Sequence, residues 1–220
     1  MKQYVLFDLD GTITDPKVGI TKSVQYALNA MGIKVDNLDD LCKFIGPPLR
    51  ESFMYFYHFD EDGAEFAVSK YREYFSDKGI FENVLYDGIP DMLENLKNNG
   101  KTIILATSKP TIYAEKILKH FHIDGAFSFV SGSELDGRRS NKEDVIEYAL
   151  CQNQIVAPDS AIMVGDREYD IIGAAKTGIH SIGVLYGYGS FDELSRAGAT
   201  KIVSTVNELA EALLECNFKI

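Results

Sequence analysis

Two aspartates stand close to the start of this 220-residue chain, in the stretch Phe7-Asp8-Leu9-Asp10-Gly11-Thr12. The apolar residues just before them include β-branched and aromatic side chains and predict a buried strand over residues 4–7. Side chains alternate along a strand, so Asp8 and Asp10 project to the same side. Two carboxylates placed together are costly unless a positive charge lies between them. The stretch fits either a cation-binding site or an ordinary Asp-Gly turn, and other residues must decide between the two.

Polar side chains also follow two other predicted strands. Thr107 and Ser108 come directly after a buried strand over residues 102–106, and Asp166 follows one over residues 160–164. In open α/β sheets, ligands bind beyond the carboxyl ends of the strands. We therefore expect these side chains to meet Asp8 at one edge of a sheet.

Asp170 and Lys142 complete this group. Asp170 stands four residues after Asp166, a spacing that returns its side chain to the same side on a turn or helix, and Lys142 opens a predicted helix. Carboxylate ligands without histidine or thiolate suit Mg²⁺, which would relieve the repulsion between Asp8 and Asp166. A hydroxyl, a lysine amine and backbone N–H groups are what a transferring phosphoryl group needs around its oxygens.

The elements that must position these groups alternate between helix and strand from residue 87 onward. Helices are predicted at 90–99, 111–121, 141–152, 169–176 and 206–216, and strands at 102–106, 126–130, 160–164, 180–185 and 202–203. This alternation predicts a doubly wound parallel α/β sheet covered on both faces. Residues 16–82 have helical spacing throughout. The predicted architecture is an α/β core domain of residues 1–15 and 83–220, with a small all-helical domain of residues 16–82 inserted after the first strand.

Charge and composition limit the partners. The net charge of −11 argues against a nucleic-acid polymer or an anionic membrane surface, because both would be repelled. No apolar run is long enough to span a bilayer, and the first residues lack the pattern of a signal peptide. Three widely spaced cysteines, Cys42, Cys151 and Cys216, predict reduced thiols in a cytoplasmic protein. A small phosphorylated metabolite remains open as a ligand, because a metal or local donors can bind it.

Four motifs in chain order resemble those of the haloacid dehalogenase-like (HAD) hydrolase superfamily: Asp8-Leu9-Asp10-Gly11-Thr12, Thr107, Lys142 and Gly165-Asp166 with Asp170. The helical stretch resembles the cap domain of that superfamily, which lies between its first two motifs. The resemblance covers essentially the whole chain and implies a Rossmann-type core. The stretches Phe44–Leu49 and Met163–Arg167 are similar to the phosphoglycolate-phosphatase-like subgroup.

The resemblance implies a phosphatase with an aspartyl-phosphate intermediate. Asp8 would attack phosphorus, and Asp10 would protonate the leaving alkoxide and then deprotonate the attacking water. Mg²⁺ would bind the Asp8 side chain, the Asp10 backbone carbonyl and Asp166. The phosphoryl oxygens would be held by Thr107, Lys142 and the N–H groups of Leu9, Asp10 and Ser108.

Three further residues have less specific expectations. Asp170 would orient Lys142 or a water on the metal, or would be an exposed acid at a helix start. Arg50 follows a Gly-Pro-Pro turn in the helical stretch and could meet a second anionic group of the substrate, or could be solvated. Lys109 beside Thr107 has the same two alternatives and is also a candidate for substrate specificity.

Several alternatives stay open beside a Mg²⁺-dependent phosphatase of phosphoglycolate-, nucleotide- or pyrophosphate-like substrates. Asp10 argues against dehalogenase chemistry, in which no leaving alkoxide needs a proton. Residues 16–26 contain no histidine, which disfavours a sugar-phosphate mutase, and no motif supports a phosphonate-cleaving lysine. A non-enzymatic receiver-like phospho-acceptor would use the same groups, but receivers have no helical insertion. The sequence leaves both monomer and homodimer possible.

Overall fold

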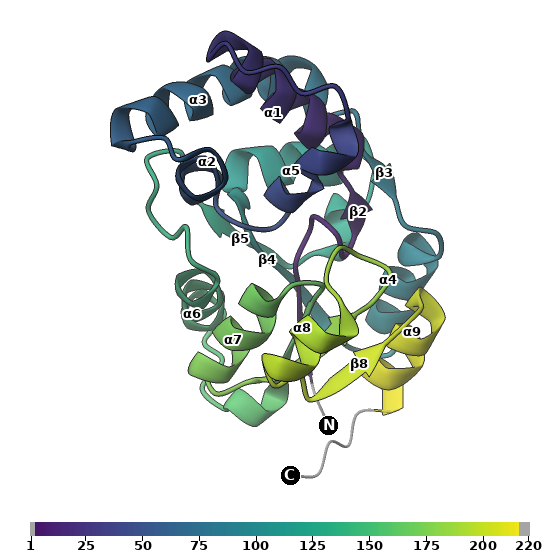
Figure 1. Cartoon of the computed structure of the whole chain (residues 1–220). Coiled ribbons are helices and arrows are strands. Elements are labelled where there is room, and N and C mark those ends of the chain that lie inside the picture. The colour runs from purple at the N-terminus through teal and green to yellow at the C-terminus, as the bar shows by residue number, and fades with distance from the viewer. Residues whose placement is uncertain (1–2, 216–220) are drawn as a thin grey trace. The chain divides into compact units, whose positions relative to one another are not determined.

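The computed structural model describes residues 3–215, and the chain divides into two compact units (Figure 1). The larger unit contains Met1–Asp15 and Leu85–Ile220, and the smaller contains Pro16–Val84. The boundary predicted after residue 82 falls two residues before the observed one. Cys216, the last residue of the final predicted helix, lies outside the described residues.

The larger unit alternates strands and helices along the chain. Its elements are β1 (Tyr4–Phe7), β2 (Thr14–Asp15), α4 (Ile89–Asn98), β4 (Thr102–Pro110), α5 (Thr111–His120), η3 (Asp124–Ala126), β5 (Phe129–Ser133), α6 (Lys142–Gln152), η4 (Pro158–Ser160), β6 (Ala161–Gly165), α7 (Glu168–Lys176), β7 (His180–Val184), α8 (Phe191–Arg196), β8 (Lys201–Val203) and α9 (Val206–Glu215). A short strand β3 (Val84–Leu85) pairs with β2 where the chain passes between the units.

Six parallel strands form the central sheet in the order β5-β4-β1-β6-β7-β8. From β1 the chain steps outward to β4 and β5, then returns to β6 and steps outward in the other direction. Right-handed crossovers place the helices of these two halves on opposite faces. The predicted doubly wound α/β fold is therefore confirmed, and β1 and β6 flank the switch point at which such sheets bind ligands.

One face of the sheet packs against α6 and α7. Leu6, Ile104 and Met163 come from three adjacent strands and are fully buried against Val145 and Ile146 of α6. The neighbouring strand residues point the opposite way, because side chains alternate along a strand. Strands that are buried on both faces read as continuous apolar runs, which explains why 4–7 and 102–106 lack polar alternation.

Two strands differ from their predicted ranges by more than one residue at an end. The strand predicted at 126–130 begins only at Phe129, because Asp124–Ala126 forms a 3₁₀ turn that the apolar residues around it do not reveal. The strand predicted at 102–106 continues to Pro110, although its last residues are polar. The polar segment stays in the sheet because Pro110 pairs with Ser133 of β5. This pairing joins segments that are distant in sequence, so the local pattern of residues does not reveal it.

The smaller unit is helical, as predicted for this part of the chain. It contains α1 (Lys17–Ala30), η1 (Leu38–Phe44), α2 (Leu49–Tyr57), α3 (Glu61–Tyr74) and the π-helical turn η2 (Phe75–Gly79). The aromatic run in α2 is divided between its interior and its surface. Phe53 is fully buried with its ring 4.9 Å from that of Phe44, whereas Tyr55 is 75% exposed.

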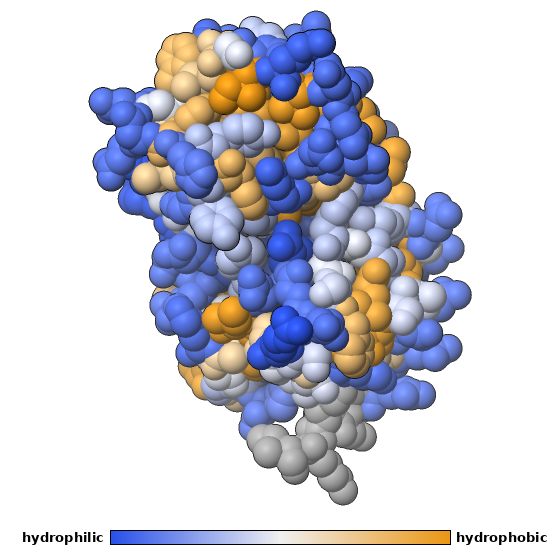
Figure 2. Space-filling view, viewed as in Figure 1, coloured by the Kyte–Doolittle hydropathy of each residue, from blue (hydrophilic) through white to orange (hydrophobic). Residues whose placement is uncertain are grey.

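Hydrophobic residues also reach the surface of this unit. Figure 2 shows them gathered over α1 and α3 among charged residues, and Tyr26 and Phe66 are the exposed aromatic side chains of these helices. Single exposed apolar residues are normal on protein surfaces.

In the described part of the chain, the helices are too short or too polar to traverse a bilayer.

We predict that Leu6→Ala destabilises the larger unit. Leu6 is fully buried in the sheet core, so its truncation leaves a cavity that should lower the free energy of unfolding by about 2–5 kcal/mol. Urea denaturation followed by circular dichroism measures the change. Val156, which is 91% exposed, supplies the matched control, because Val156→Ala should change stability by less than about 0.5 kcal/mol. Equal stability of the two variants would contradict the assigned core.

Candidate active site

The ends of β1 and β6 bring two acids together at the centre of the sheet. Phe7 is in register with both Leu105 and Val164, so the residues that follow these strands emerge at the same level. The backbone N–H of Asp8 donates to the Val164 carbonyl at 2.9 Å and continues the ladder by one residue. Asp8 is 5% exposed and Asp166 is fully buried.

Asp170 joins Asp8 and Asp166 in a buried cluster of three carboxylates. One oxygen of each residue lies within 4.8 Å of the others, a spacing that could hold a metal ion. Asp170 reaches the cluster from the first turn of α7, where its carboxylate also accepts a hydrogen bond from the Arg167 N–H. The structure thus brings together three acids that come from two motifs far apart in the sequence.

Lys142 lies between two of these acids. Its Nζ is 2.8 Å from Oδ1 of Asp8 and 2.8 Å from Oδ1 of Asp170. The amine also donates to the Ala106 carbonyl at 3.2 Å, which ties it to the end of β4. Lys142 stands at the first position of α6, so the helix start sets the direction from which its side chain reaches the cluster.

The protonation equilibria of the cluster show an excess of negative charge. Burial raises the pKa of Asp166 well above its ordinary value, and the charges of Asp170 and Asp8 raise it further. Burial also raises the pKa of Asp170 to about 6, although Lys142 opposes this. Burial alone would lower the pKa of Lys142, but the charges of Asp170 and Asp8 outweigh it and the pKa rises. One ammonium group therefore does not neutralise the site.

A divalent cation fits this donor set. Asp166 accepts hydrogen bonds from the hydroxyl of Thr12 at 3.3 Å and from the N–H of Tyr188 at 2.8 Å, both neutral donors. Within the described residues it forms no ion pair with a lysine, arginine or histidine side chain, and the charge of the neighbouring Arg167 only partly opposes the rise of its pKa. Carboxylate oxygens without nitrogen or sulfur ligands are the donors that Mg²⁺ and Ca²⁺ prefer. The unpaired acid marks the side of the cluster on which a cation would bind.

Asp10 lies beside this cluster with a different partner. Its Oδ2 is 2.6 Å from Nζ of Lys109, and both residues are buried. Its Oδ1 is buried without a hydrogen-bond partner among the described residues. Burial raises the pKa of Asp10, and the charge of Lys109 opposes the rise. Lys109 is therefore neither solvated nor at the surface, the alternative that its position beside Thr107 had left open.

Of the remaining predicted site residues, Thr107, Ser108 and Leu9 belong to the larger unit and Arg50 belongs to the smaller unit. Thr107 is buried, its Oγ1 accepts a hydrogen bond from the Lys109 N–H at 3.3 Å, and the Ser108 carbonyl accepts one from Ser133. Leu9 is fully buried, and its carbonyl closes the turn after β1 by accepting from the N–H groups of residues 12–14. Arg50 belongs to the smaller unit, where its guanidinium pairs with glutamates of α3.

The loop 186–189 after β7 is a part of the site that the sequence analysis missed. Besides the Tyr188 N–H on Asp166, the Tyr186 hydroxyl donates to the Thr12 carbonyl at 3.0 Å, and the Tyr188 hydroxyl donates to Asp15. A Cβ on Gly187 would lie 2.3 Å from the Gly11 carbonyl and 2.4 Å from Cβ of Asp166. The alternation of tyrosine and glycine in residues 186–189 was the sequence signal for this contact. Only glycine lets the backbone of the loop come so close to Gly11 and Asp166.

Comparisons with known proteins agree with this arrangement. The protein-family model described as haloacid dehalogenase-like hydrolase matches residues 5–184. A 5'-nucleotidase from Pseudomonas aeruginosa is 46% identical over 209 residues, which cover 95% of this chain and 94% of that protein. The tyrosine-protein kinase PtkA from Mycobacterium tuberculosis is 39% identical over 96% of this chain and 72% of its own length. A crystal structure of a predicted phosphatase from Clostridium acetobutylicum superposes with a TM-score of 0.96 at 53% identity, covering 98% of this chain and 99% of that chain.

We predict that Asp166→Asn stabilises the metal-free protein at pH 7. Because the folded-state pKa of Asp166 is raised, its ionised form opposes folding, and the neutral amide removes this cost. The stability gain should shrink as the pH falls toward the ordinary aspartate pKa of about 4, where the wild-type side chain is protonated in both states. Urea unfolding in the presence of a chelator at pH 5 and pH 7 measures both effects. Asp159→Asn, at a largely exposed acid, is the matched control, and a less stable Asp166→Asn at pH 7 would refute the charge excess.

Proposed function

The chain belongs to the haloacid dehalogenase-like hydrolase family, and from this premise we propose that it is a Mg²⁺-dependent phosphatase of small phosphomonoesters that forms an aspartyl-phosphate at Asp8. Its place among phosphoric monoester hydrolases follows from the family and the phosphatases to which it is similar. The observation that carries the finer proposal is the buried contact of Lys142 with Asp8 beside Asp166, an acid that forms no ion pair within residues 3–215.

In the first step, a carboxylate oxygen of Asp8 forms a bond to phosphorus as the ester P–O bond breaks. The electron pair of that bond leaves with the ester oxygen, which takes a proton from Asp10, so the alcohol departs neutral. Lys142 is placed to balance the negative charge of the phosphoryl oxygens, because its amine already lies 2.8 Å from the attacking side chain. Thr107 lies in the adjacent strand β4 and offers a hydroxyl donor.

In the second step, water attacks the phosphorus of the aspartyl-phosphate. Asp10, now ionised, accepts a proton from the water, and the P–O bond to Asp8 breaks with its electron pair returning to the carboxylate. The product is inorganic phosphate, and both aspartates return to their original protonation states. The separate partners of the two acids support these unequal roles, since Asp8 faces Lys142 and Asp10 faces Lys109.

Mg²⁺ would be held by Asp8, Asp166 and the backbone carbonyl of Asp10, and would supply charge neutralisation between the nucleophile and the phosphate. Asp170 holds Lys142 through their 2.8 Å contact and keeps the amine directed toward Asp8. The fit of the carboxylate cluster to a hard cation supports this part of the proposal.

The substrate class is proposed from the relatives. The similarity to a 5'-nucleotidase favours a nucleoside monophosphate among the small phosphomonoesters. A turnover screen with Mg²⁺ should include nucleoside monophosphates, phosphoglycolate, sugar phosphates, pyrophosphate and phosphotyrosine. Release of inorganic phosphate supports a phosphatase, transfer of phosphate within a sugar phosphate supports a mutase, and a stable phosphoenzyme without turnover supports the receiver-like alternative.

We predict that Asp8→Asn abolishes phosphate release while leaving the fold intact, because the amide cannot attack phosphorus. Asp10→Asn should lower kcat by about 10²–10⁴-fold, the range for loss of a general acid or base. Steady-state phosphate release and acid-quenched phosphoenzyme measure these effects, and only Asp8→Asn should lack the phosphoenzyme. Asp192→Asn on α8 is the control for an exposed acid. Appreciable turnover by Asp8→Asn would rule out its role as nucleophile.

We also predict that exhaustive chelation removes the activity and that Mg²⁺ restores it. Because a cation that binds only the folded state stabilises it, Mg²⁺ should raise the urea midpoint of the wild type in proportion to its concentration over the dissociation constant. Asp166→Ala should show a much smaller shift in the same titration. Full activity after chelation, or an equal midpoint shift in both proteins, would be incompatible with the proposed metal site.

A further inference from the structure

Lys109 is a buried cation in the site for which the proposed reaction has no use. Its ammonium lies 2.6 Å from Oδ2 of Asp10, whereas Lys142 contacts Asp8. We propose that Lys109 is a positioning residue, which holds one oxygen of Asp10 so that the other is presented to the leaving group. This inference rests on the proposed function, because it concerns the proton that Asp10 transfers.

A bulge in β4 brings Lys109 to this place. Between the pairs Ala106–Ser131 and Pro110–Ser133, β4 advances by four residues while β5 advances by two, so β4 carries two extra residues. Such a bulge bends the strand and re-aims its side chains. Lys109 is the last residue before Pro110, which ends β4. Because the bulge re-aims the side chains of this segment, Lys109 lies buried beside Asp10.

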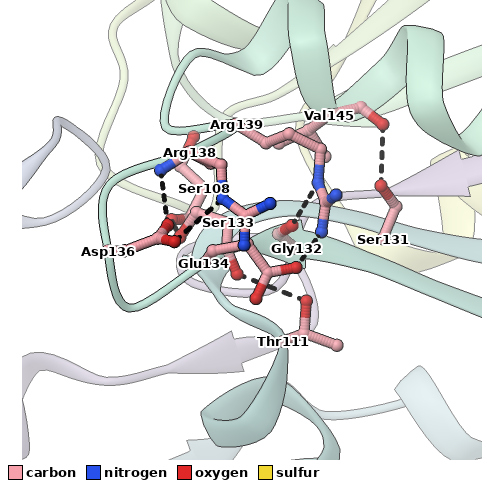
Figure 3. Close-up of polar contacts among 10 residues, drawn as sticks. All are labelled: Ser108, Thr111, Ser131, Gly132, Ser133, Glu134, Asp136, Arg138, Arg139 and Val145. Carbon is pink, nitrogen blue, oxygen red and sulfur yellow. Dashed lines mark hydrogen bonds and ion pairs between the residues drawn. The ribbon is translucent and has the colours of Figure 1, made fainter.

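Hydrogen bonds that involve side chains of β4, α5 and β5 hold this bulge. The Ser133 hydroxyl donates to the Ser108 carbonyl at 2.7 Å, and the Thr111 hydroxyl donates to the Ser133 carbonyl at 3.3 Å (Figure 3). A Cβ on Gly132 would lie only 2.6 Å from the Lys109 carbonyl, so β5 approaches the bulge as closely as a backbone allows. Thr107 adds a contact within the bulge through the Lys109 N–H.

The ion pair divides the two oxygens of Asp10 between different tasks. Oδ2 is held by Lys109, whereas Oδ1 is buried without a hydrogen-bond partner among the described residues. A buried carboxylate oxygen without a partner is costly, so it marks a place where a further group is expected to bind. In the proposed reaction that group is the ester oxygen in the first step and the attacking water in the second.

Stability does not account for the pair. Removing two charges from water costs as much as or more than their attraction returns, and apolar residues of similar volume are often as stable. A methionine at position 109 would fill much of the same space without that cost. The charged amine that Lys109 retains beside Asp10 therefore points to positioning of the Asp10 carboxyl group.

If Lys109 positions Asp10 for proton transfer, the loss of kcat/KM on replacing Lys109 should depend on the basicity of the leaving group. Phenolate is a strong base and needs the proton of Asp10, whereas the p-nitrophenolate ion is a far weaker base and departs without it. Phenyl phosphate and p-nitrophenyl phosphate are closely matched in shape and share the same second step. The ratio kcat/KM reports the steps up to formation of the aspartyl-phosphate, so it isolates the proton transfer to the leaving group.

The experiment compares kcat/KM of Lys109→Met and the wild type for these two substrates with Mg²⁺ present. We expect a loss on the order of 10²-fold for phenyl phosphate and of less than about tenfold for p-nitrophenyl phosphate. Lys109→Arg, which keeps a charged donor, should restore most of the phenyl phosphate activity and serves as the second variant if Lys109→Met does not fold. Equal losses for both substrates would overturn the proposal.

A buried lysine at the other end of the same strand provides the matched control. Lys101 directly precedes β4 and is as little exposed as Lys109, but the strand separates it from the site. Lys101→Met should change kcat/KM equally, if at all, for the two substrates, and a leaving-group dependence like that of Lys109→Met would also overturn the proposal. If the wild type releases phosphate from neither substrate, nor from any in the turnover screen, the proposed function fails. If the wild type is active and Lys109→Met is indistinguishable from it, only the positioning role fails.

Discussion

The repulsion among buried carboxylates is the constraint on which the rest of the site depends. Asp8, Asp166 and Asp170 lie within 4.8 Å of one another at a place from which water is largely excluded. Such a group is stable only where other interactions hold it together, because each ionised acid raises the cost of ionising the next. Lys142 meets part of this demand, and the fold around the cluster provides the rest.

The parallel sheet places the charges together without requiring them to be near in sequence. β1 lies between β4 and β6, so its carboxyl end faces the ends of both neighbours. Two loops then close around the cluster. The loop 186–189 donates a backbone N–H to Asp166 and, through its tyrosine hydroxyls, contacts the turn after β1. The bulge in β4 delivers a second lysine to Asp10.

Two ion pairs of similar length consequently serve two acids that are separated by a single residue in the chain. Lys142 approaches Asp8 from the first position of α6, and Lys109 approaches Asp10 from the end of β4. Their separation gives the proposed nucleophile and the proposed acid–base group different electrostatic surroundings, although both follow the same strand. In the proposed reaction each acid would serve one half of phosphoryl transfer, attack on phosphorus or transfer of a proton.

The class of fold and the residues that meet at the edge of the sheet could be predicted from the amino-acid sequence. Apolar runs that end in polar residues identify buried parallel strands, and the ends of such strands must share an edge, so Asp8, Thr107 and Asp166 could be collected without coordinates. The pairing of each lysine with its acid, Lys142 with Asp8 and Lys109 with Asp10, depends on the tertiary structure. Lys109 stands only two residues after Thr107, and its burial results from a bulge that depends on the register of β5, a segment more than twenty residues away. Tyr188 likewise reaches Asp166 across 22 positions, and local spacing carries no information about such contacts.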